Sequence, residues 1–340
     1  MEDNHQNPRP LALLAGRQSE SFAETIAQKF NMKTVSRLIK TFPNGEIEVE
    51  ILESVRGFEV FIIQTFIPGK INDGIIELLL LADAVRRAGS PRVRAVLRIY
   101  PYARQDRREG NKKNRHKRKP VSARLIADLI SLKFDSVIAF DWHAEQIEGF
   151  FDGNKVTAEN IQPFILFSEY LKKNNIIKEK YLNEKEKPIM VAPDVGSSKR
   201  VSDYADNLRL NYAIVDKRRK NGTDVDIRNV IGDVQGHPCI IVDDISATGG
   251  TLIGAKKALT SQGATDVMVV VTHLEAIGVK DIEKLAEAGF SKIIVTDSIT
   301  LPDEIKNYPV FEVISLIPIM TKVIHNVYNS ESLQSVVFEG

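Results

Sequence analysis

The chain has 340 residues, and its 46 Lys and Arg residues balance 45 Asp and Glu residues, which leaves a net charge of +1. This length predicts two domains of ordinary size, and the charge balance argues against the broad basic surface of a nucleic-acid-binding protein. The single cysteine, Cys239, excludes an internal disulfide framework and a cysteine-based zinc cluster. No apolar run reaches the ~20 residues that span a bilayer. Because residues 1–10 also lack the apolar core of a signal peptide, we expect a cytoplasmic protein with no membrane partner.

Apolar runs of strand length alternate with stretches of helical periodicity along the whole chain. Strands are predicted at residues 11–15, 47–51, 60–64, 93–99, 136–140, 188–192, 212–215, 239–242, 267–272, 292–296 and 310–315. Helices are predicted at residues 19–30, 72–89, 122–132 and 158–172, and from residue 251 to a stop at Gly263. This alternation predicts an α/β fold with two open, mainly parallel sheets flanked by helices. We expect one domain at 10–157, a second at 158–312, and a terminal strand and helix at 313–330 that pack back on the domains.

The most informative stretch is CIIVDDISATGGTL, residues 239–252. Its apolar start is typical of a strand buried on both faces, and Asp243 and Asp244 stand where that strand should end. The small-residue turn that follows lets backbone N–H groups at the start of a helix approach a phosphate. The two carboxylates would repel a phosphate but suit sugar hydroxyls or a metal ion. The alternative is a tight turn whose glycines only make the bend; the combination favours a site for a phosphorylated sugar.

A strongly basic segment follows the strand at 93–99. Residues 104–119 hold nine Lys or Arg against Asp106 and Glu109, and such a run repels itself unless an anion neutralises it. Its place between a strand and a helix favours a loop that closes over a polyphosphate. A solvated charge run and a nucleic-acid patch are the alternatives, but the segment has no aromatic residue after Tyr102.

Charged residues also follow several other predicted strands. Asp141 and His143 come after the strand at 136–140, Asp194 after that at 188–192, and the charge run 216–220 after that at 212–215. Open α/β sheets bind ligands at the carboxyl ends of their strands, so these residues are candidates for metal or phosphate binding. The alternatives are a structural histidine and an exposed charged turn.

In this order the motifs resemble the ribose-phosphate pyrophosphokinase family, which makes phosphoribosyl pyrophosphate (PRPP). The matching stretches are FPNGE (42–46), ESVRG (53–57), ND (72–73) with ELL (77–79), PYARQD (101–106), PVSA (120–123), residues 141–152, PDVG (193–196) with KR (199–200), KRR (217–219) and the run 239–252. The resemblance covers about residues 11–325. It implies two phosphoribosyltransferase-like domains and transfer of the pyrophosphoryl group of MgATP to the 1-hydroxyl of ribose 5-phosphate, giving PRPP and AMP. Phosphoribosyltransferases share only the Asp-Asp loop and one domain.

The resemblance also implies roles for individual residues. The catalytic cations are Lys217 and Arg219, and the Mg²⁺ ligands are His143 and Asp194. ATP is bound by Arg104, Gln105 and Asp106, together with Phe42, Asn44 and Glu46 of a neighbouring subunit. Ribose 5-phosphate is bound by Asp243, Asp244, Ala247, Thr248, Gly249, Gly250 and Thr251. The family implies a homodimer that builds a tetramer or hexamer.

Three features depart from the family pattern. Ala247 stands at a position that is usually Asp or Ser, and the segment 107–119 is longer and more basic than in the family. Two serines, Ser197 and Ser198, follow the glycine of PDVG, where small residues are usual, and we expect the site to persist. Two other functions stay open at this point, a non-catalytic regulatory subunit and a transferase that consumes PRPP. Retention of Lys217, Arg219 and the two metal ligands favours the active enzyme over a non-catalytic subunit.

Overall fold

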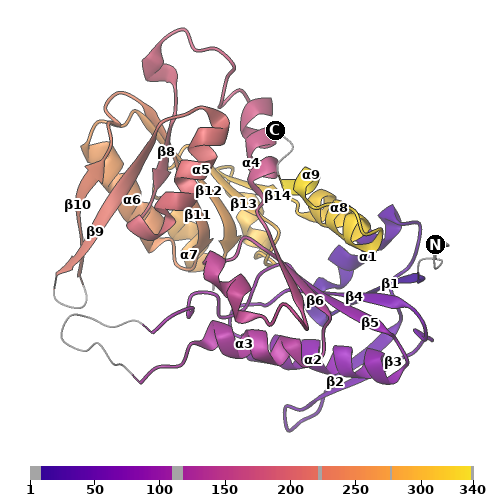
Figure 1. Cartoon of the computed structure of the whole chain (residues 1–340). Helices are drawn as coiled ribbons and strands as arrows, with labels where there is room; N and C mark the ends of the chain where they lie inside the picture. Colours follow the sequence, from indigo (N-terminus) through magenta and orange to yellow (C-terminus); the bar gives the residue numbers. More distant parts are fainter. Residues whose placement is uncertain (1–8, 109–117, 221–223, 276–277, 338–340) are drawn as a thin grey trace. The chain divides into compact units, whose positions relative to one another are not determined.

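The computed structural model describes residues 9–108, 118–220, 224–275 and 278–337 (Figure 1). Residues 109–117, most of the basic segment expected to close over a polyphosphate, lie outside the described residues. Contacts divide the chain into two compact units. The first holds the residues up to Gln162 together with Ile317–Val336, and the second holds Pro163–Leu316.

The first unit is built on a five-stranded parallel sheet with the order β1-β4-β5-β6-β7. Its strands are β1 (Leu11–Ala15), β4 (Glu59–Gln64), β5 (Arg92–Leu97), β6 (Ser136–Phe140) and β7 (Thr157–Ile161). Its helices are α1 (Glu20–Lys29), α2 (Ile71–Arg87), α3 (Ser122–Ser131) and α8 (Ile317–Tyr328), with the short α9 (Gln334–Val337) after them. Helices α2 and α3 lie on one side of the sheet, and α1 and α8 on the other (Figure 1). Because both faces are covered, every residue of β4 is buried.

A separate hairpin stands beside this sheet. Strand β2 (Arg37–Thr41) pairs antiparallel with β3 (Ile47–Ile51), and β3 packs against α2. The turn 42–46 joins the two strands, and the alternation of half-buried and exposed residues along β3 agrees with the sequence pattern.

The second unit is built on a seven-stranded sheet with the order β10-β9-β8-β11-β12-β13-β14. Its strands are β8 (Ile189–Ala192), β9 (Tyr212–Lys220), β10 (Asp224–Ile231), β11 (Pro238–Ser246), β12 (Asp266–Leu274), β13 (Ile293–Thr296) and β14 (Phe311–Ile314). Strand β10 pairs antiparallel with β9, and the other pairs are parallel. The short 3₁₀ helices of the chain are Arg17–Ser19, Glu145–Phe150, Glu184–Glu186, Val195–Ser197 and Asp303–Asn307.

Helices cover both faces of this second sheet. Helices α4 (Phe164–Lys173) and α5 (Ser198–Leu208) pack on one face through a core that includes Val201 and Met190. Helices α6 (Gly250–Ser261) and α7 (Val279–Ala286) pack on the other through a core that includes Leu252, Leu285 and Val191. From β8 the chain passes through α5 to β9 on one side, and from β11 through α6 to β12 on the other. The ends of β8 and β11 therefore form the switch point at which open α/β sheets bind ligands.

Two expectations about secondary structure are wrong. The helix expected from residue 158 begins at Phe164, because 157–161 pairs with β6 as the last strand of the first sheet. The strand expected to end at residue 215 continues to Lys220, because it pairs with β10, a strand that the sequence patterns did not predict.

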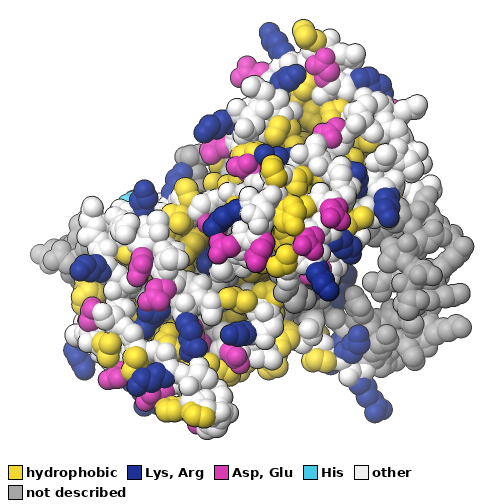
Figure 2. Space-filling model, turned by 180° about the vertical axis from the view of Figure 1, so that it is seen from behind, with side chains coloured by type: hydrophobic (Ala, Val, Ile, Leu, Met, Phe, Trp, Pro, Cys, Tyr) yellow, Lys and Arg dark blue, Asp and Glu magenta, His cyan; other side chains and the backbone are white. Residues whose placement is uncertain are grey.

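The surface agrees with the balanced composition. On the face shown in Figure 2, basic and acidic side chains are intermingled, with no large patch of one sign. In the described part of the chain, no helix combines the length and the apolar character needed to cross a membrane.

A buried ion pair joins three strands of the first sheet. The Arg94 guanidinium contacts the carboxylate of Glu59 in β4 and donates a hydrogen bond of 2.9 Å to the hydroxyl of Ser136 in β6. The Glu59 side chain is 7% exposed and that of Arg94 is 13% exposed. Both charges thus lie within the packed core, where the removal of one leaves the other buried without a counter-ion.

We predict that Glu59→Ala lowers the free energy of unfolding of the first unit by about 3–5 kcal/mol, because it leaves a buried guanidinium without its counter-ion. The matched control is Asp128→Ala, which removes a half-exposed partner of Arg124 on α3 and should cost about 0–1 kcal/mol. Urea denaturation of the full chain measures both, and equal losses in the two variants would contradict the role of burial.

Candidate functional site

Strand β11 carries both aspartates of the central sequence run. It continues past them to Ser246, because Ile245 and Ser246 still pair with His273 and Leu274 of β12. Asp244 is buried and Asp243 is half-buried. The expectation that the strand ends at these aspartates is therefore wrong. Strand pairing on both sides of them holds their backbone more firmly than a loop would.

Gly249 forms the sharp turn between this strand and α6. Its φ of +70° lies in the left-handed region, and a Cβ there would lie 2.5 Å from Cδ2 of Leu285 in α7. Gly250 has no such constraint, since a Cβ on it would first meet Thr248 Oγ1 at 3.6 Å. Within the described residues no side chain caps the start of α6, so the first N–H groups of this helix are available to an anion.

Three carboxylates and one guanidinium determine the charge beside this turn. Arg200 of α5 lies with Nη1 2.7 Å from Oδ1 of Asp244. The pKa of Asp243 is raised well above its usual range, first by burial and then by the carboxylates of Asp244 and Asp194. Arg200 acts in the opposite direction on the pKa of Asp243 but does not cancel the effect. Burial and repulsion between the carboxylates therefore both oppose ionisation of Asp243.

Asp194 begins the turn that follows β8, the neighbour of β11. Its Oδ1 accepts a hydrogen bond of 3.2 Å from the backbone N–H of Ser197, which fixes the orientation of the carboxylate. A Cβ on Gly196 would lie 3.1 Å from the same oxygen. The small residue at this position thus leaves room for the Asp194 side chain.

Lys217 and Arg219 lie in the part of β9 that extends past its neighbour β8. The last pair between the two strands joins Ile214 to Ala192. Beyond it Lys217 pairs with Ile227, and Arg219 with Val225, both of β10. Strand β9 also contacts the turn Val195–Ser197. The structure therefore places these two positions at the same edge of the second sheet as the three carboxylates.

In the first unit, the residues after β5 form a loop that is anchored from two sides. Gln105 Oε1 accepts a hydrogen bond of 2.7 Å from the hydroxyl of Ser122 at the start of α3. Buried Asp106 accepts a hydrogen bond of 2.5 Å from Gln146 Nε2. Arg104 is exposed. Two of the three predicted ATP-binding residues are thus engaged in contacts that hold the loop, and the guanidinium extends from it.

His143 stands at the end of β6, which is the parallel neighbour of β5. The residue before it, Trp142, is buried and packs on Tyr100 and Phe151, with ring centroids 5.4 and 6.0 Å apart. The backbone N–H of Trp142 donates to Asn160 Oδ1 at 3.0 Å. This packing holds the turn in place and leaves the imidazole of His143 exposed at the same edge of the first sheet as the loop 104–106.

The predicted adenine-binding residues lie in the hairpin turn between β2 and β3. The Phe42 side chain is exposed, and Asn44 Oδ1 accepts a hydrogen bond of 3.1 Å from the N–H of Glu46. Within the described part of the chain, the hydrogen bonds of this turn join its own residues and none reaches another predicted site residue. The structure therefore presents these three residues at a surface and does not bring them together with the rest.

Sequence reasoning assigned no role to three residues that shape these sites. Arg200 had a signal, because it follows the PDVG stretch by one helical turn and could meet a carboxylate on the next strand. Gln146 also had a signal, because it lies in the matching stretch 141–152, although its contact with Asp106 could not be foreseen. Leu285 had none, because its contact with Gly249 joins segments far apart in the chain.

Comparisons with known proteins agree with this arrangement. Residues 11–132 match the N-terminal domain of ribose phosphate pyrophosphokinase, and residues 168–303 match the phosphoribosyl transferase domain. A ribose-phosphate pyrophosphokinase of Campylobacter jejuni is 36% identical over 328 residues, which are 96% of this chain and 99% of the relative. One of Aquifex aeolicus is 35% identical over 326 residues, with 96% and 98% covered. The solved structure of phosphoribosylpyrophosphate synthetase from Mycobacterium smegmatis aligns with a TM-score of 0.83 at 32% identity, covering 95% of this chain and 100% of that one.

We predict that Gly249→Ala lowers the free energy of unfolding by about 2–4 kcal/mol, because a left-handed backbone is unfavourable for alanine and the new Cβ overlaps Leu285. Gly250→Ala is the matched control; it places a helix-favouring residue in open space and should change stability by less than about 1 kcal/mol. Thermal unfolding distinguishes the two. Equal stability of the Gly249→Ala chain and the unmodified chain would show that the close approach to Leu285 does not constrain the turn.

Proposed function

The chain belongs to the ribose-phosphate pyrophosphokinase family, whose enzymes make PRPP and AMP from MgATP and ribose 5-phosphate, and we propose which of its residues perform this reaction. One observation carries the assignment of roles. The carboxylates of Asp243 and Asp244, the glycine turn and the uncapped start of α6 meet at the switch point of the second sheet. This arrangement suits a phosphorylated sugar.

We propose that ribose 5-phosphate binds at this turn. Backbone N–H groups from Ala247 to Thr251 and the hydroxyls of the two threonines hold the 5-phosphate, so the missing side chain at Ala247 costs no backbone donor. Asp243 and Asp244 accept hydrogen bonds from the ribose hydroxyls. Arg200 orients the carboxylate of Asp244 through the contact of 2.7 Å.

The charge of the site also suits Mg²⁺. Burial and the neighbouring carboxylates of Asp244 and Asp194 raise the pKa of Asp243, so a cation bound there would favour its ionised form, and Mg²⁺ prefers such oxygen ligands. Among the described residues, no group of three or more His, Cys, Asp or Glu side chains is arranged to hold a metal ion by itself. We therefore propose that Asp194 and His143 supply protein ligands, and that substrate phosphates and water supply the rest. The bound ion would neutralise phosphate charge as the pyrophosphoryl group is transferred.

The chemistry needs positioned cations rather than a covalent nucleophile. The 1-hydroxyl of the sugar attacks the β-phosphorus of ATP in line, and AMP leaves. We propose that Lys217 and Arg219 stabilise the oxygens on which negative charge increases during this step. Arginine offers a fixed fork of donors, and lysine a mobile point charge.

For ATP, we propose the loop with Arg104, Gln105 and Asp106 as the phosphate-side contact. The exposed turn with Phe42, Asn44 and Glu46 would bind the adenine of a neighbouring subunit, since it makes no contact with the other site residues of its own chain among the bonds described above. This assignment requires a homodimer, from which a tetramer or hexamer can be built.

Two other functions are less well supported. A non-catalytic regulatory subunit has no need for the carboxylates, the cations and the turn all to be retained. A transferase that consumes PRPP would not need the N-terminal pyrophosphokinase domain that residues 11–132 match.

We predict that the purified chain, mixed with ATP, Mg²⁺ and ribose 5-phosphate, forms AMP and a sugar-linked diphosphate in a phosphorus NMR time course. Chelation of Mg²⁺ with EDTA should stop the reaction, and added Mg²⁺ should restore it. Formation of ADP would indicate a simple kinase and contradict the proposal. An absence of turnover, with and without added phosphate, would support the regulatory subunit instead.

We predict that Lys217→Ala slows AMP formation by roughly 10²–10³-fold, as expected for the loss of one charge-stabilising donor, while the melting temperature stays the same. The matched control is Arg218→Ala, which removes the cation between the two proposed catalytic positions. Alternate residues of a strand face the same side, so the pattern groups positions 217 and 219 and separates them from position 218. Similar rates in the two variants would overturn the role given to Lys217.

A further inference from the structure

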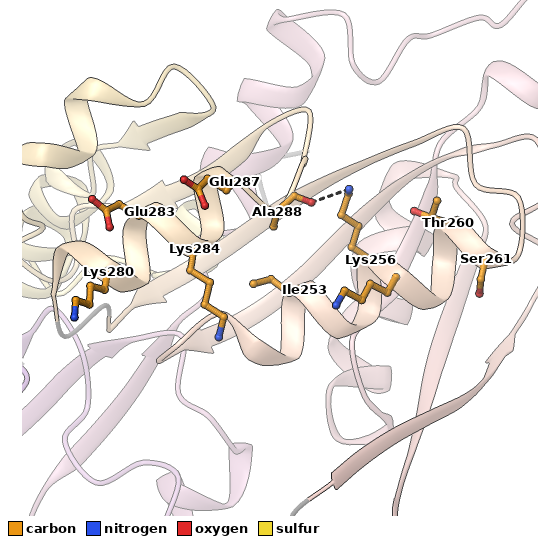
Figure 3. Close-up of a pocket in the computed structure, with 10 residues that line it drawn as sticks. Ile253, Lys256, Thr260, Ser261, Lys280, Glu283, Lys284, Glu287 and Ala288 are labelled. Atoms are coloured by element: carbon orange, nitrogen blue, oxygen red, sulfur yellow. Dashed lines mark hydrogen bonds between the residues drawn. The ribbon is translucent and has the colours of Figure 1, made fainter.

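A groove lies between α6 and α7 on the surface of the second unit (Figure 3). Its volume is about 850 Å³, within the range of roughly 300–1,000 Å³ that is usual for small-molecule sites. The residues that line it are Ile253, Lys256, Lys257, Thr260, Ser261, Lys280, Glu283, Lys284, Glu287 and Ala288. None of them belongs to the sites described above, so the groove is a separate feature.

Four lysines line this groove, and they have two different roles. Lys256 Nζ donates a hydrogen bond of 2.8 Å to the carbonyl of Ala288 and lies over the ring of Phe290. It therefore joins α6 to the end of α7. Lys257, Lys280 and Lys284 are exposed, and in the described part of the chain none of these three forms an ion pair.

Two glutamates, Glu283 and Glu287, also line the groove. Burial raises the pKa of Tyr308, and the nearby carboxylates of Glu283 and Glu287 raise it further. In Figure 3 both carboxylates lie on the side of α7 away from α6, whereas the side chain of Lys284 extends toward α6. The lysines of the groove thus outnumber its glutamates, and both glutamates lie near Tyr308.

We propose that this groove is a binding site for a polyphosphate group, either free or carried by a nucleotide. Three ammonium groups around one cavity suit several adjacent phosphates better than a single one. Lys280 and Lys284 are four residues apart on α7, so their like charges repel each other, and a bound anion would relieve this repulsion. Ile253 and Ala288 add apolar surface, and Thr260 adds a hydroxyl donor, whereas the hydroxyl of Ser261 already donates to the carbonyl of Ala258 at 2.7 Å.

A ligand in this groove would act on the turn that we assign to ribose 5-phosphate, and this step rests on the proposed function. Helix α6 begins at that turn, and Leu285 of α7 lies against Gly249. An anion that ties α6 to α7 therefore restrains the two helices that shape the turn. Occupancy of the groove should change the affinity for ribose 5-phosphate, and ribose 5-phosphate should change the affinity of the groove by the same factor.

The first test measures binding without turnover, so it does not depend on the proposed reaction. Calorimetric titration of the full chain uses tripolyphosphate, and separately cytidine triphosphate, at fixed ionic strength. Lys257→Ala/Lys280→Ala/Lys284→Ala should weaken one binding event by at least ~10-fold, because charge-assisted hydrogen bonds are lost. Lys256 is left intact because of its bond to Ala288.

The matched control removes three exposed lysines elsewhere in the second unit, with the variant Lys172→Ala/Lys173→Ala/Lys180→Ala. It should bind both probes as the unmodified chain does. Tighter binding of cytidine triphosphate would identify a nucleotide as the ligand, and equal binding would identify the inorganic chain. The proposal is overturned if the groove variant binds both probes normally, or if the control loses as much affinity as the groove variant.

The second test measures the affinity for ribose 5-phosphate with and without tripolyphosphate. The change in affinity should occur in the unmodified chain and in the control, and it should be lost in the groove variant. An unchanged affinity in the unmodified chain would overturn the link between the groove and the turn. Thermal unfolding shows whether the variants keep the fold.

Discussion

The accumulation of carboxylate charge at the ends of β8 and β11 is the constraint on which the rest of the second unit depends. Asp243, Asp244 and Asp194 stand near one another with Arg200 as their counter-ion. Such a group is unfavourable in the free protein, because burial and mutual repulsion both oppose ionisation. It becomes favourable when hydroxyl donors or a divalent cation arrive. The sheet holds the group in place through strand pairing that continues beyond the aspartates, so the fold offsets the energetic cost of assembling it.

Much of this arrangement could be predicted from local sequence. The apolar start of β11 and the residues from Thr248 to Thr251 identify a strand, a phosphate turn and a helix without any knowledge of the rest of the chain. The parallel α/β class follows in the same way from the alternation of elements. The match of motif order along the chain then distinguishes a pyrophosphokinase from a transferase, which no single motif could do.

The errors and omissions have one physical cause, which is pairing between segments far apart in the chain. Strand β9 continues through a run of charged residues that looks like a turn, because β10 pairs with it along that run. Residues 157–161 look helical by periodicity, but they form a strand because they pair with β6. The contact of Arg200 with Asp244 depends on which strands are neighbours. Local propensity does not contain this information, since tertiary pairing overrides it.

The contact between Gly249 and Leu285 connects the site to the groove. In the described residues the start of α6 has no side-chain cap, so the turn takes its shape from a backbone conformation that only glycine adopts easily and from the leucine packed against it. Leu285 belongs to α7, and Lys284 beside it faces the groove. A displacement of α7 therefore reaches the turn at Gly249 through direct packing. Close-packed interiors transmit such shifts because they have little free volume to absorb them. The same glycine that makes the turn possible thus also makes it sensitive to whatever binds between the two helices.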